Sequence, residues 1–261
     1  MTREPTVLYA ADAGIATLTM HRPEVYNALS LELHTDLIAA LERAEADPAV
    51  RCLVLTGGTG KAFSSGQDLR EFPLEGAPAM IGERLRANYN PLVQKLMTMP
   101  KPIIAALNGV AAGAGFSIAL ACDLRIAATS ARLVVAFIRI GLIPDCGMLY
   151  TLPRLVGQAR AFELAARGAD LDAATALNLG LLNLVVPDEE LPAAARALAS
   201  ELAHRPAYAL GLLKQTMHAS AGASLVATLE YEAQAQQQAG AHPDFAEGVQ
   251  AFREKRPARF G

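Results

Sequence analysis

The chain has 261 residues, of which 52% are hydrophobic and 19% charged, and its 23 basic and 26 acidic side chains give a net charge of -3. This length fits one domain with an appendage or two small domains, and the near-neutral charge excludes the broad positive field that nucleic acid requires. The three cysteines Cys52, Cys122 and Cys146 lack ligand spacing, so neither a disulfide framework nor a metal site is expected. No signal-peptide or membrane-spanning run is evident, which predicts a cytoplasmic protein without membrane contact.

Strands and helices are predicted to alternate along the first half of the chain. In chain order they are strands at 6–10 and 15–20, a helix at 31–46, a strand at 52–56, a helix at 80–99, a strand at 102–107, a helix at 115–122 and a strand at 124–128. The strands are mostly continuous Val, Ile and Leu runs, which indicates a sheet covered on both faces. The pattern predicts the α/β class.

The C-terminal quarter is predicted to be helical. After Pro187 the segments 189–203, 207–220 and 224–239 all have a helical period, and no strand-like run remains. Because no Gly/Ser or Pro-rich linker marks this change, we predict a core over 1–187 with an attached helical subdomain over 188–261.

Three catalytic or nucleotide-binding motifs are nearly present and fail in detail. The glycines at 57–60 before Lys61 lack the Ser/Thr of a phosphate loop, and Ile118 stands where a dinucleotide fingerprint has its third glycine. Ser117 resembles a hydrolase nucleophile, but it lies inside an apolar helical run, which favours a helix-facing hydroxyl. The five histidines have no metal-ligand spacing.

Two turns rich in small residues follow buried strands, at 61–69 (KAFSSGQDL) and 108–115 (NGVAAGAG). Small residues let a ligand approach backbone N–H groups, and the second turn leads into a helix whose N-terminus favours negative charge. Two convergent N–H groups would form an oxyanion hole. On composition alone, a purely structural role for these turns is the more ordinary interpretation.

Several separated motifs occur in an order that resembles the crotonase superfamily, also called the enoyl-CoA hydratase/isomerase family. They are His21-Arg22-Pro23 with Asn27-Ala28-Leu29, then 62–69, 101–109, Cys122-Asp123 and Glu247 to Phe252. The resemblance covers about Val7 to Arg256 and implies a crotonase-like spiral of ββα units with a C-terminal helical trimerisation region. It also implies an acyl-CoA substrate, a homotrimer or dimer of trimers, and no cofactor besides the coenzyme A of the substrate.

The resemblance further implies a set of site residues. In this family two backbone N–H groups hold the thioester oxygen, and here they would belong to Gln67 and Ala114. The residues implied to bind CoA or the acyl group are Arg22, Ser64, Ser65, Gly66, Gln67, Asp68, Leu69, Tyr89, Gly113 and Lys255, the last from a neighbouring subunit.

One carboxylate stands out as the candidate catalytic group. Hydratases of this family use two glutamates, and Ser117 and Phe137 occupy those positions, so hydration is disfavoured. Asp145 lies among apolar neighbours that should raise its pKa. From the residues alone, an N-cap for a helix that begins near Gly147 is an equal alternative. The resemblance favours catalysis, because several isomerases and a dehalogenase of the family have an Asp at this position.

The surroundings of Asp145 resemble the family's isomerases of phenylacetate breakdown. The predicted reaction is therefore isomerisation, through a thioester enolate, of a 1,2-epoxide of phenylacetyl-CoA or of an unsaturated acyl-CoA. Met148 departs from the glycine usual at its position, which leaves the acyl group open. The alternatives are an enoyl-CoA hydratase, a hydrolase or dehalogenase with Asp145 as nucleophile, and a non-catalytic binding protein.

Overall fold

The computed structural model describes residues 5–71 and 81–261. Its larger sheet has six strands in the order β1 (Val7–Asp12), β2 (Ile15–Met20), β3 (Cys52–Thr56), β5 (Ile103–Leu107), β7 (Leu124–Ala128) and β10 (Leu184–Val186). β1 is antiparallel to β2, and the other neighbours are parallel. The smaller sheet has the order β4 (Ala62–Ser64), β6 (Val110–Ala112), β8 (Arg132–Val134) and β9 (Asp170–Asp172).

The two sheets are built by a repeated unit. β3 with β4, β5 with β6 and β7 with β8 each contribute their first strand to the larger sheet and their second to the smaller one, and helices follow each pair. This is the predicted spiral of ββα units. Within the smaller sheet β4, β6 and β8 are parallel, so the ends of β4 and β6 lie side by side.

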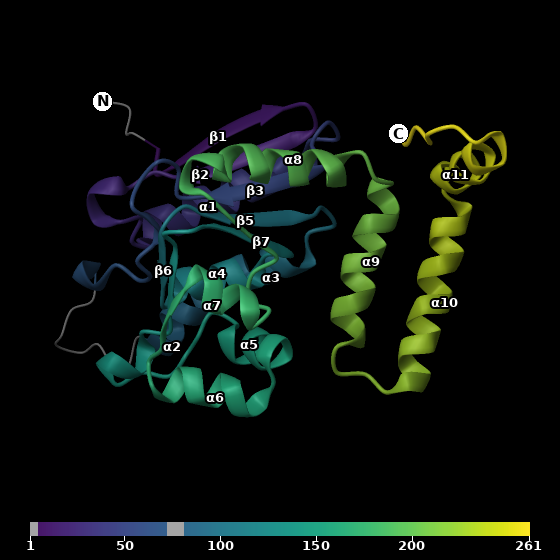
Figure 1. Ribbon diagram of the computed structural model, residues 1–261. Coiled ribbons are helices and arrows are strands. Elements are labelled where there is room, and N and C mark those ends of the chain that lie inside the picture. Colours follow the sequence, from purple (N-terminus) through teal and green to yellow (C-terminus); the bar gives the residue numbers. More distant parts are fainter. Residues whose placement is uncertain (1–4, 72–80) are drawn as a thin grey trace.

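Helices cover both faces of the larger sheet, as the continuous apolar strands predict (Figure 1). In β3, Leu53 and Leu55 face the main core with α1 (Leu31–Ala46), α3 (Asn90–Thr98) and α4 (Ala114–Ala121). The alternate residues Cys52 and Val54 pack beneath α8 (Leu191–Ala203). The period of two along a strand therefore divides one apolar run between two cores.

The helix predicted over 80–99 is interrupted. Met80 lies outside the described residues, and the rest forms α2 (Ile81–Arg84), a π-helical turn (Leu85–Tyr89) and α3. Pro91 explains the interruption, because proline has no N–H for the preceding turn and its ring crowds the carbonyl four residues back. The Asn90 N–H instead bonds the Leu85 carbonyl, one residue farther back than in an α-helix.

The remaining helices run from the core to the end of the chain. They are α5 (Met148–Val156), α6 (Gln158–Ala166), α7 (Ala173–Asn178), α9 (Ala207–Ser220), α10 (Leu225–Ala241) and α11 (Pro243–Glu254). The three helical segments predicted after Pro187 are confirmed as α8, α9 and α10. The domain boundary predicted there stays a prediction, and α8, just beyond it, packs on the larger sheet.

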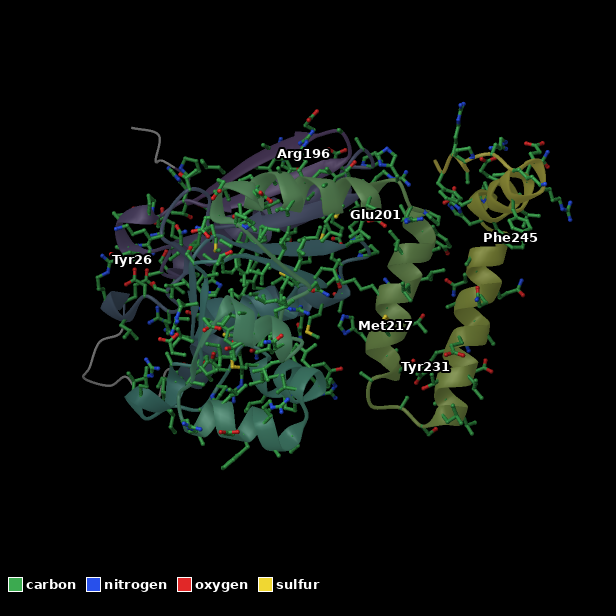
Figure 2. The ribbon with its side chains drawn as sticks, viewed as in Figure 1. Tyr26, Arg196, Glu201, Met217, Tyr231 and Phe245 are labelled. Carbon is green, nitrogen blue, oxygen red and sulfur yellow. The ribbon has the colours of Figure 1, made fainter. Side chains whose placement is uncertain are left out.

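The last three helices extend away from the sheets (Figures 1 and 2). α9, which carries Met217, contacts α3 and α10, and α10, which carries Tyr231, contacts α9 and α11. None of the residues of α10 is buried within this chain. None of the helices in the described ranges is both long and apolar enough to cross a membrane.

Candidate functional site

The two small-residue turns lie against each other. β4 and β6 pair at Ala62↔Val110 and Ser64↔Ala111. A Cβ placed on Gly66 would lie 2.7 Å from the Ala112 carbonyl oxygen and 3.4 Å from the Ala114 nitrogen. A Cβ on Gly115 would lie 2.6 Å from the Ser64 carbonyl oxygen. Glycine at 66 and 115 is thus required by the close approach of the two turns.

Two asparagine side-chain amides hold the first turn in place. Asn27, itself 1% exposed, donates from Nδ2 to the Ala62 carbonyl at 3.0 Å, and Asn108 donates to the same oxygen at 3.1 Å. The Ser64 hydroxyl donates to the Asn27 carbonyl at 2.8 Å and accepts from the Gly66 N–H at 3.2 Å. Both asparagines lie in motifs of the family resemblance, but these supporting contacts join residues distant in sequence and were not predicted.

The two N–H groups predicted to form the oxyanion hole have no acceptor among the described residues. On either side of Gln67, the Gly66 and Asp68 N–H groups donate to the Ser64 hydroxyl and the Leu29 carbonyl, while that of Gln67 does not donate. Ala114 is the first residue of α4, so its N–H has no partner within the helix. Both groups are therefore available to a ligand oxygen.

The two positions where hydratases of the family have glutamates carry no base. Ser117 is fully buried, and its hydroxyl donates to the Gly113 carbonyl at 3.3 Å, which is the helix-facing arrangement that its sequence context favours. Phe137 is 6% exposed and lies beside the second turn, since its Cζ is 4.0 Å from the position of a Cβ on Gly113. An apolar ring thus lies beside the second turn.

Asp145 lies in the turn before α5 and does not cap that helix. The N-cap of α5 is Gly147, with no side-chain hydrogen bond, and Asp145 contributes only its backbone carbonyl, which accepts from the Met148 N–H at 3.0 Å. The alternative of an N-cap is therefore wrong. The carboxylate is half-buried, and its Oδ1 is enclosed without a hydrogen-bond partner.

Burial raises the pKa of the Asp145 carboxyl, and the adjacent Cys146 thiol partly offsets this effect. The direction agrees with the sequence prediction. Cys146 is 3% exposed and has a left-handed backbone with φ of 51°, which is uncommon for a residue other than glycine. The backbone next to the carboxylate is therefore in a strained region.

A charged cluster anchors the far end of the first turn. Asp68 is 4% exposed and accepts from Arg22 at 3.1 Å and from Arg70 at 2.6 Å. Hydrogen bonds, chiefly from Arg70, hold the pKa of the Asp68 carboxyl well below its usual range. Arg22 is half-buried and also donates to the Ala28 carbonyl, whereas most of Arg70 is exposed. Arg22 as a CoA ligand stays a prediction, and the structure gives it two internal acceptors.

The other predicted binding residues differ in how accessible they are. Ser65 and Leu69 are exposed beside the turn, Ser64 is completely buried, and Tyr89 is buried at the end of the π-helical turn. Lys255 ends α11, which lies beyond α10 and α9 in Figure 1. One chain therefore does not bring Lys255 to the other predicted residues, and its contribution from a neighbouring subunit stays a prediction.

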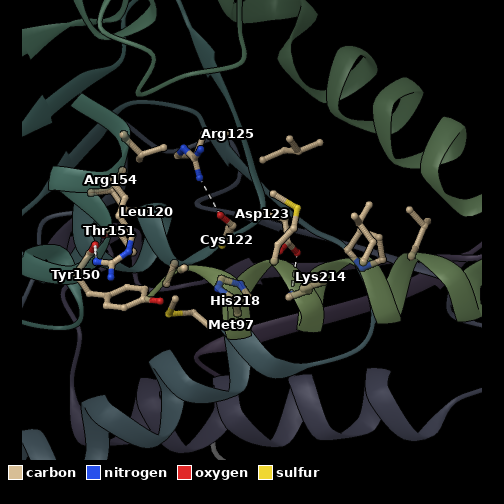
Figure 3. Close-up of a pocket in the computed structure, with 18 of the residues that line it drawn as sticks. Met97, Leu120, Cys122, Asp123, Arg125, Tyr150, Thr151, Arg154, Lys214 and His218 are labelled. Carbon is tan, nitrogen blue, oxygen red and sulfur yellow. Dashed lines mark hydrogen bonds and ion pairs between the residues drawn. The ribbon is translucent and has the colours of Figure 1, made fainter. Parts of the chain in front are cut away.

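A cavity of about 460 Å³ lies elsewhere, between α9 and the core (Figure 3). Its walls are mostly apolar, and its polar residues include Asp123 and Lys214, which form an ion pair at 2.8 Å. None of the sequence-predicted site residues lines it. In the described ranges no three His, Cys, Asp or Glu side chains are grouped so that they could hold a metal ion.

Comparison with known proteins gives a consistent result. Residues 10–261 match the enoyl-CoA hydratase/isomerase family. The chain is 43% identical over 256 residues to the 1,2-epoxyphenylacetyl-CoA isomerase of Escherichia coli (strain K12), with 97% of each chain covered. It is 45% identical over 255 residues to a Rhodobacter capsulatus protein named "Probable enoyl-CoA hydratase", with 98% of this chain and 97% of that one covered.

Two further matches are to proteins named as a dehalogenase and as an enoyl-CoA hydratase. The chain is 35% identical over 244 residues to 4-chlorobenzoyl coenzyme A dehalogenase-2 of Arthrobacter sp, with 93% of this chain and 88% of that one covered. The solved structure of an enoyl-CoA hydratase from Mycobacterium smegmatis superposes with a TM-score of 0.92 at 32% identity, covering 98% and 99% of the two chains.

Proposed function

Since this chain belongs to the enoyl-CoA hydratase/isomerase family, we propose that it is an acyl-CoA isomerase in which Asp145 transfers the proton. The observation that carries the proposal is the unpaired Oδ1 of Asp145, next to Cys146, which belongs to the same buried cluster as Ala114 and Phe137. Ser117 and Phe137 stand at the two positions where the family's hydratases have glutamates, so neither position supplies a second base beside Asp145.

The proposed reaction begins at the carbon next to the thioester. The Asp145 carboxylate removes a proton from that carbon, and the negative charge moves onto the thioester oxygen. The N–H groups of Gln67 and Ala114 donate to this oxygen, and each such donor contributes about 3 kcal/mol to transition-state stabilisation. The protonated Asp145 then returns the proton to a carbon farther along the acyl group, so substrate and product are isomers.

We infer that the acyl group is a ring 1,2-epoxide of phenylacetyl-CoA or an unsaturated chain. With the epoxide, the bond shared by the two rings opens to give a seven-membered oxepin ring, and no atom is gained or lost. The name of the Escherichia coli relative supports this substrate. The oxygen remains in the product, so the pocket must accommodate a polar atom within an otherwise apolar acyl group.

The test is the variant Asp145→Asn, which keeps the size of the side chain and removes the base. We expect kcat to fall by about 100- to 10,000-fold while KM for the CoA ester changes little, because the thioester contacts are backbone groups elsewhere. Asp12→Asn is the matched control, since Asp12 is an exposed carboxylate paired with Arg196 on the surface. Full turnover by Asp145→Asn would show that another group transfers the proton.

A second function is supported by the dehalogenase relative. In that case the Asp145 carboxylate attacks a halogen-bearing carbon of the acyl group, which releases halide and leaves an ester, or the thioester carbonyl, which releases the CoA thiolate and leaves an anhydride. Water then releases the product from this covalent intermediate. Single turnover in oxygen-18 water distinguishes the two, because a nucleophilic Asp145 would acquire the label and an isomerase would leave both carboxylate and product unlabelled. Hydration would add the mass of water to the product.

A further inference from the structure

Tyr89 lies where helix α3 meets the Asp145 turn. The π-helical turn ends at Tyr89, and such turns occur frequently at functional sites. Val93, one α-helical turn later on the same face, approaches the Asp145 turn so closely that a Cβ on Gly147 would lie 3.1 Å from its Cγ1. Tyr89 therefore lies beside the Asp145 turn. Burial, with a smaller effect of the Asp145 carboxylate, raises the pKa of the Tyr89 phenol, so the phenol stays protonated.

The Tyr89 ring is held by a histidine that has no polar partner. His34 of α1 is 2% exposed, and neither ring nitrogen forms a hydrogen bond. Its ring meets that of Tyr89 edge to face, with centroids 4.0 Å apart and planes at 70°. Burial, with a smaller effect of Arg84, lowers the pKa of His34 to about 4, so the imidazole is neutral. Such a buried polar ring calls for an explanation, because an apolar side chain would avoid its desolvation.

The Tyr89 hydroxyl has no hydrogen-bond partner among the described residues. The residue is only 3% exposed, but this hydroxyl is not completely enclosed, whereas the unpaired hydroxyl of Tyr9 on β1 is. The buried cluster to which Tyr89 belongs includes Val93, Phe137, Cys146 and Met148, none of which is a strong hydrogen-bond donor. A buried phenol with a free hydroxyl usually finds a partner, and the space beside Asp145 is where the acyl group would lie.

We propose that the Tyr89 hydroxyl hydrogen-bonds an oxygen atom of the acyl group, and that His34 is the positioning residue that fixes the Tyr89 ring. This inference rests on the proposed function, because it assumes that the acyl group lies beside Asp145. If Tyr89 has this role, the protein should bind acyl groups that carry an oxygen atom next to their own ring more tightly than purely hydrocarbon acyl groups. His34 acts through its ring edge, so an aromatic replacement should preserve the effect.

The experiment compares the dissociation constants of phenylacetyl-CoA and 2-hydroxyphenylacetyl-CoA by titration calorimetry. The wild-type protein should bind the hydroxylated ester about three- to tenfold more tightly, the range that one hydrogen bond supplies. Tyr89→Phe should abolish this preference and leave the affinity for phenylacetyl-CoA unchanged. Tyr9→Phe, which removes an enclosed hydroxyl far along the chain, is the control and should keep the preference.

Two variants of His34 test the positioning role. His34→Ala should reduce the preference, and His34→Phe should restore it, because the edge-to-face contact is regained. The readout is a ratio of two affinities, which a general loss of stability does not change, and thermal unfolding monitors the fold of each variant. Wild-type protein without a preference, or Tyr89→Phe with the preference intact, would overturn the role of Tyr89. His34→Ala with the full preference would overturn that of His34.

These outcomes are separate from those of the proposed function. Binding of the two esters requires no turnover, so the preference can be present even if no isomer is formed. Conversely, loss of turnover in Asp145→Asn with no effect of Tyr89→Phe on the affinity ratio would support the isomerase and contradict this inference.

Discussion

Asp145 lies in an environment where burial disfavours the ionised form of its carboxyl group. Its Oδ1 has no partner, its neighbours are apolar, and the residue that follows it has a left-handed backbone. Each of these features lowers stability, and together they are typical of a functional site at which activity has been favoured over stability. The same environment brings the pKa toward a range useful for proton transfer.

This environment predicts a dependence of stability on pH. The pKa of Asp145 is raised in the folded state above its ordinary value of 3.8, so the folded protein holds the proton more tightly than the unfolded one. The contribution to stability is fully present below the ordinary pKa and is lost as pH rises through the raised value. We therefore expect Asp145→Asn to unfold at a higher temperature than wild type at about pH 7.5, with little difference at about pH 3.5. An equal difference at both pH values would contradict this account.

At the scale of elements, the site depends on the contact between β4 and the start of α4. This contact explains why the two turns contain glycine. On composition alone, the more ordinary interpretation of these segments was a purely structural turn. The prediction of the oxyanion donors came from the family resemblance, and the structure adds that both N–H groups lack acceptors in the described part of the chain.

Gly115→Ala tests that contact. The new Cβ would lie 2.6 to 2.8 Å from atoms of Ser64, so β4 and α4 must separate. We expect a loss of about 1–3 kcal/mol in the free energy of unfolding and a larger relative loss of kcat, because the two N–H groups no longer converge. Gly240→Ala is the control, since a Cβ there meets nothing within 4 Å. Urea unfolding and steady-state kinetics measure the two effects, and unchanged kcat in Gly115→Ala would argue against the predicted oxyanion hole.

A buried lysine links helix α9 to the core through a hydrogen bond and an ion pair. Lys214 is 8% exposed, and its Nζ donates to the Leu96 carbonyl at 2.7 Å and to Asp123 at 2.8 Å. Lys214→Met should lower the free energy of unfolding by about 3 kcal/mol, which is the lower end of the range for a broken buried ion pair. The loss is at this end because Asp123 still accepts from the Ile103 N–H and is partly exposed to water. Arg167→Met, which removes an exposed pair with Glu163, should cost at most about 0.5 kcal/mol. Equal effects in urea unfolding would contradict the buried anchor.

For the whole molecule, the sequence predicted much of the framework and little of its fine structure. Strong apolar periods located five of the six strands of the larger sheet and several of the longer helices, because burial selects those patterns. The three-residue strands β4, β6, β8, β9 and β10 were not predicted, because so short a segment has no period to detect. The break at Tyr89 was signalled only by Pro91, and the roles of His34 and Asn27 depend on contacts distant in sequence.

The C-terminal helices leave apolar surface uncovered in a single chain. Leu225 is 74% exposed, Val226 79% and Phe252 85%. Together with the absence of buried residues in α10, this surface supports the predicted trimer, in which neighbouring chains would cover it.

Sedimentation velocity tests this proposal. We expect the wild-type protein to sediment as a multiple of three chains, and Val226→Lys to shift it toward the single chain by placing a charge in the interface. Gln237→Lys, an exposed polar position of the same helix, should leave the distribution unchanged. Because Lys255 is predicted to reach a neighbour's CoA, the dissociated variant should also show a raised KM. A wild-type protein that sediments as one chain would rule the trimer out.

The central claim, proton transfer by Asp145 within an isomer pair, is tested most directly by the mass of the product. Wild-type protein would be incubated with the ring 1,2-epoxide of phenylacetyl-CoA and with an unsaturated acyl-CoA in oxygen-18 water, alongside Asp145→Asn. We expect a rearranged product of unchanged mass without oxygen-18, formed by the wild type and not by the variant. A product heavier by one water, or oxygen-18 in the product or in Asp145, would contradict it.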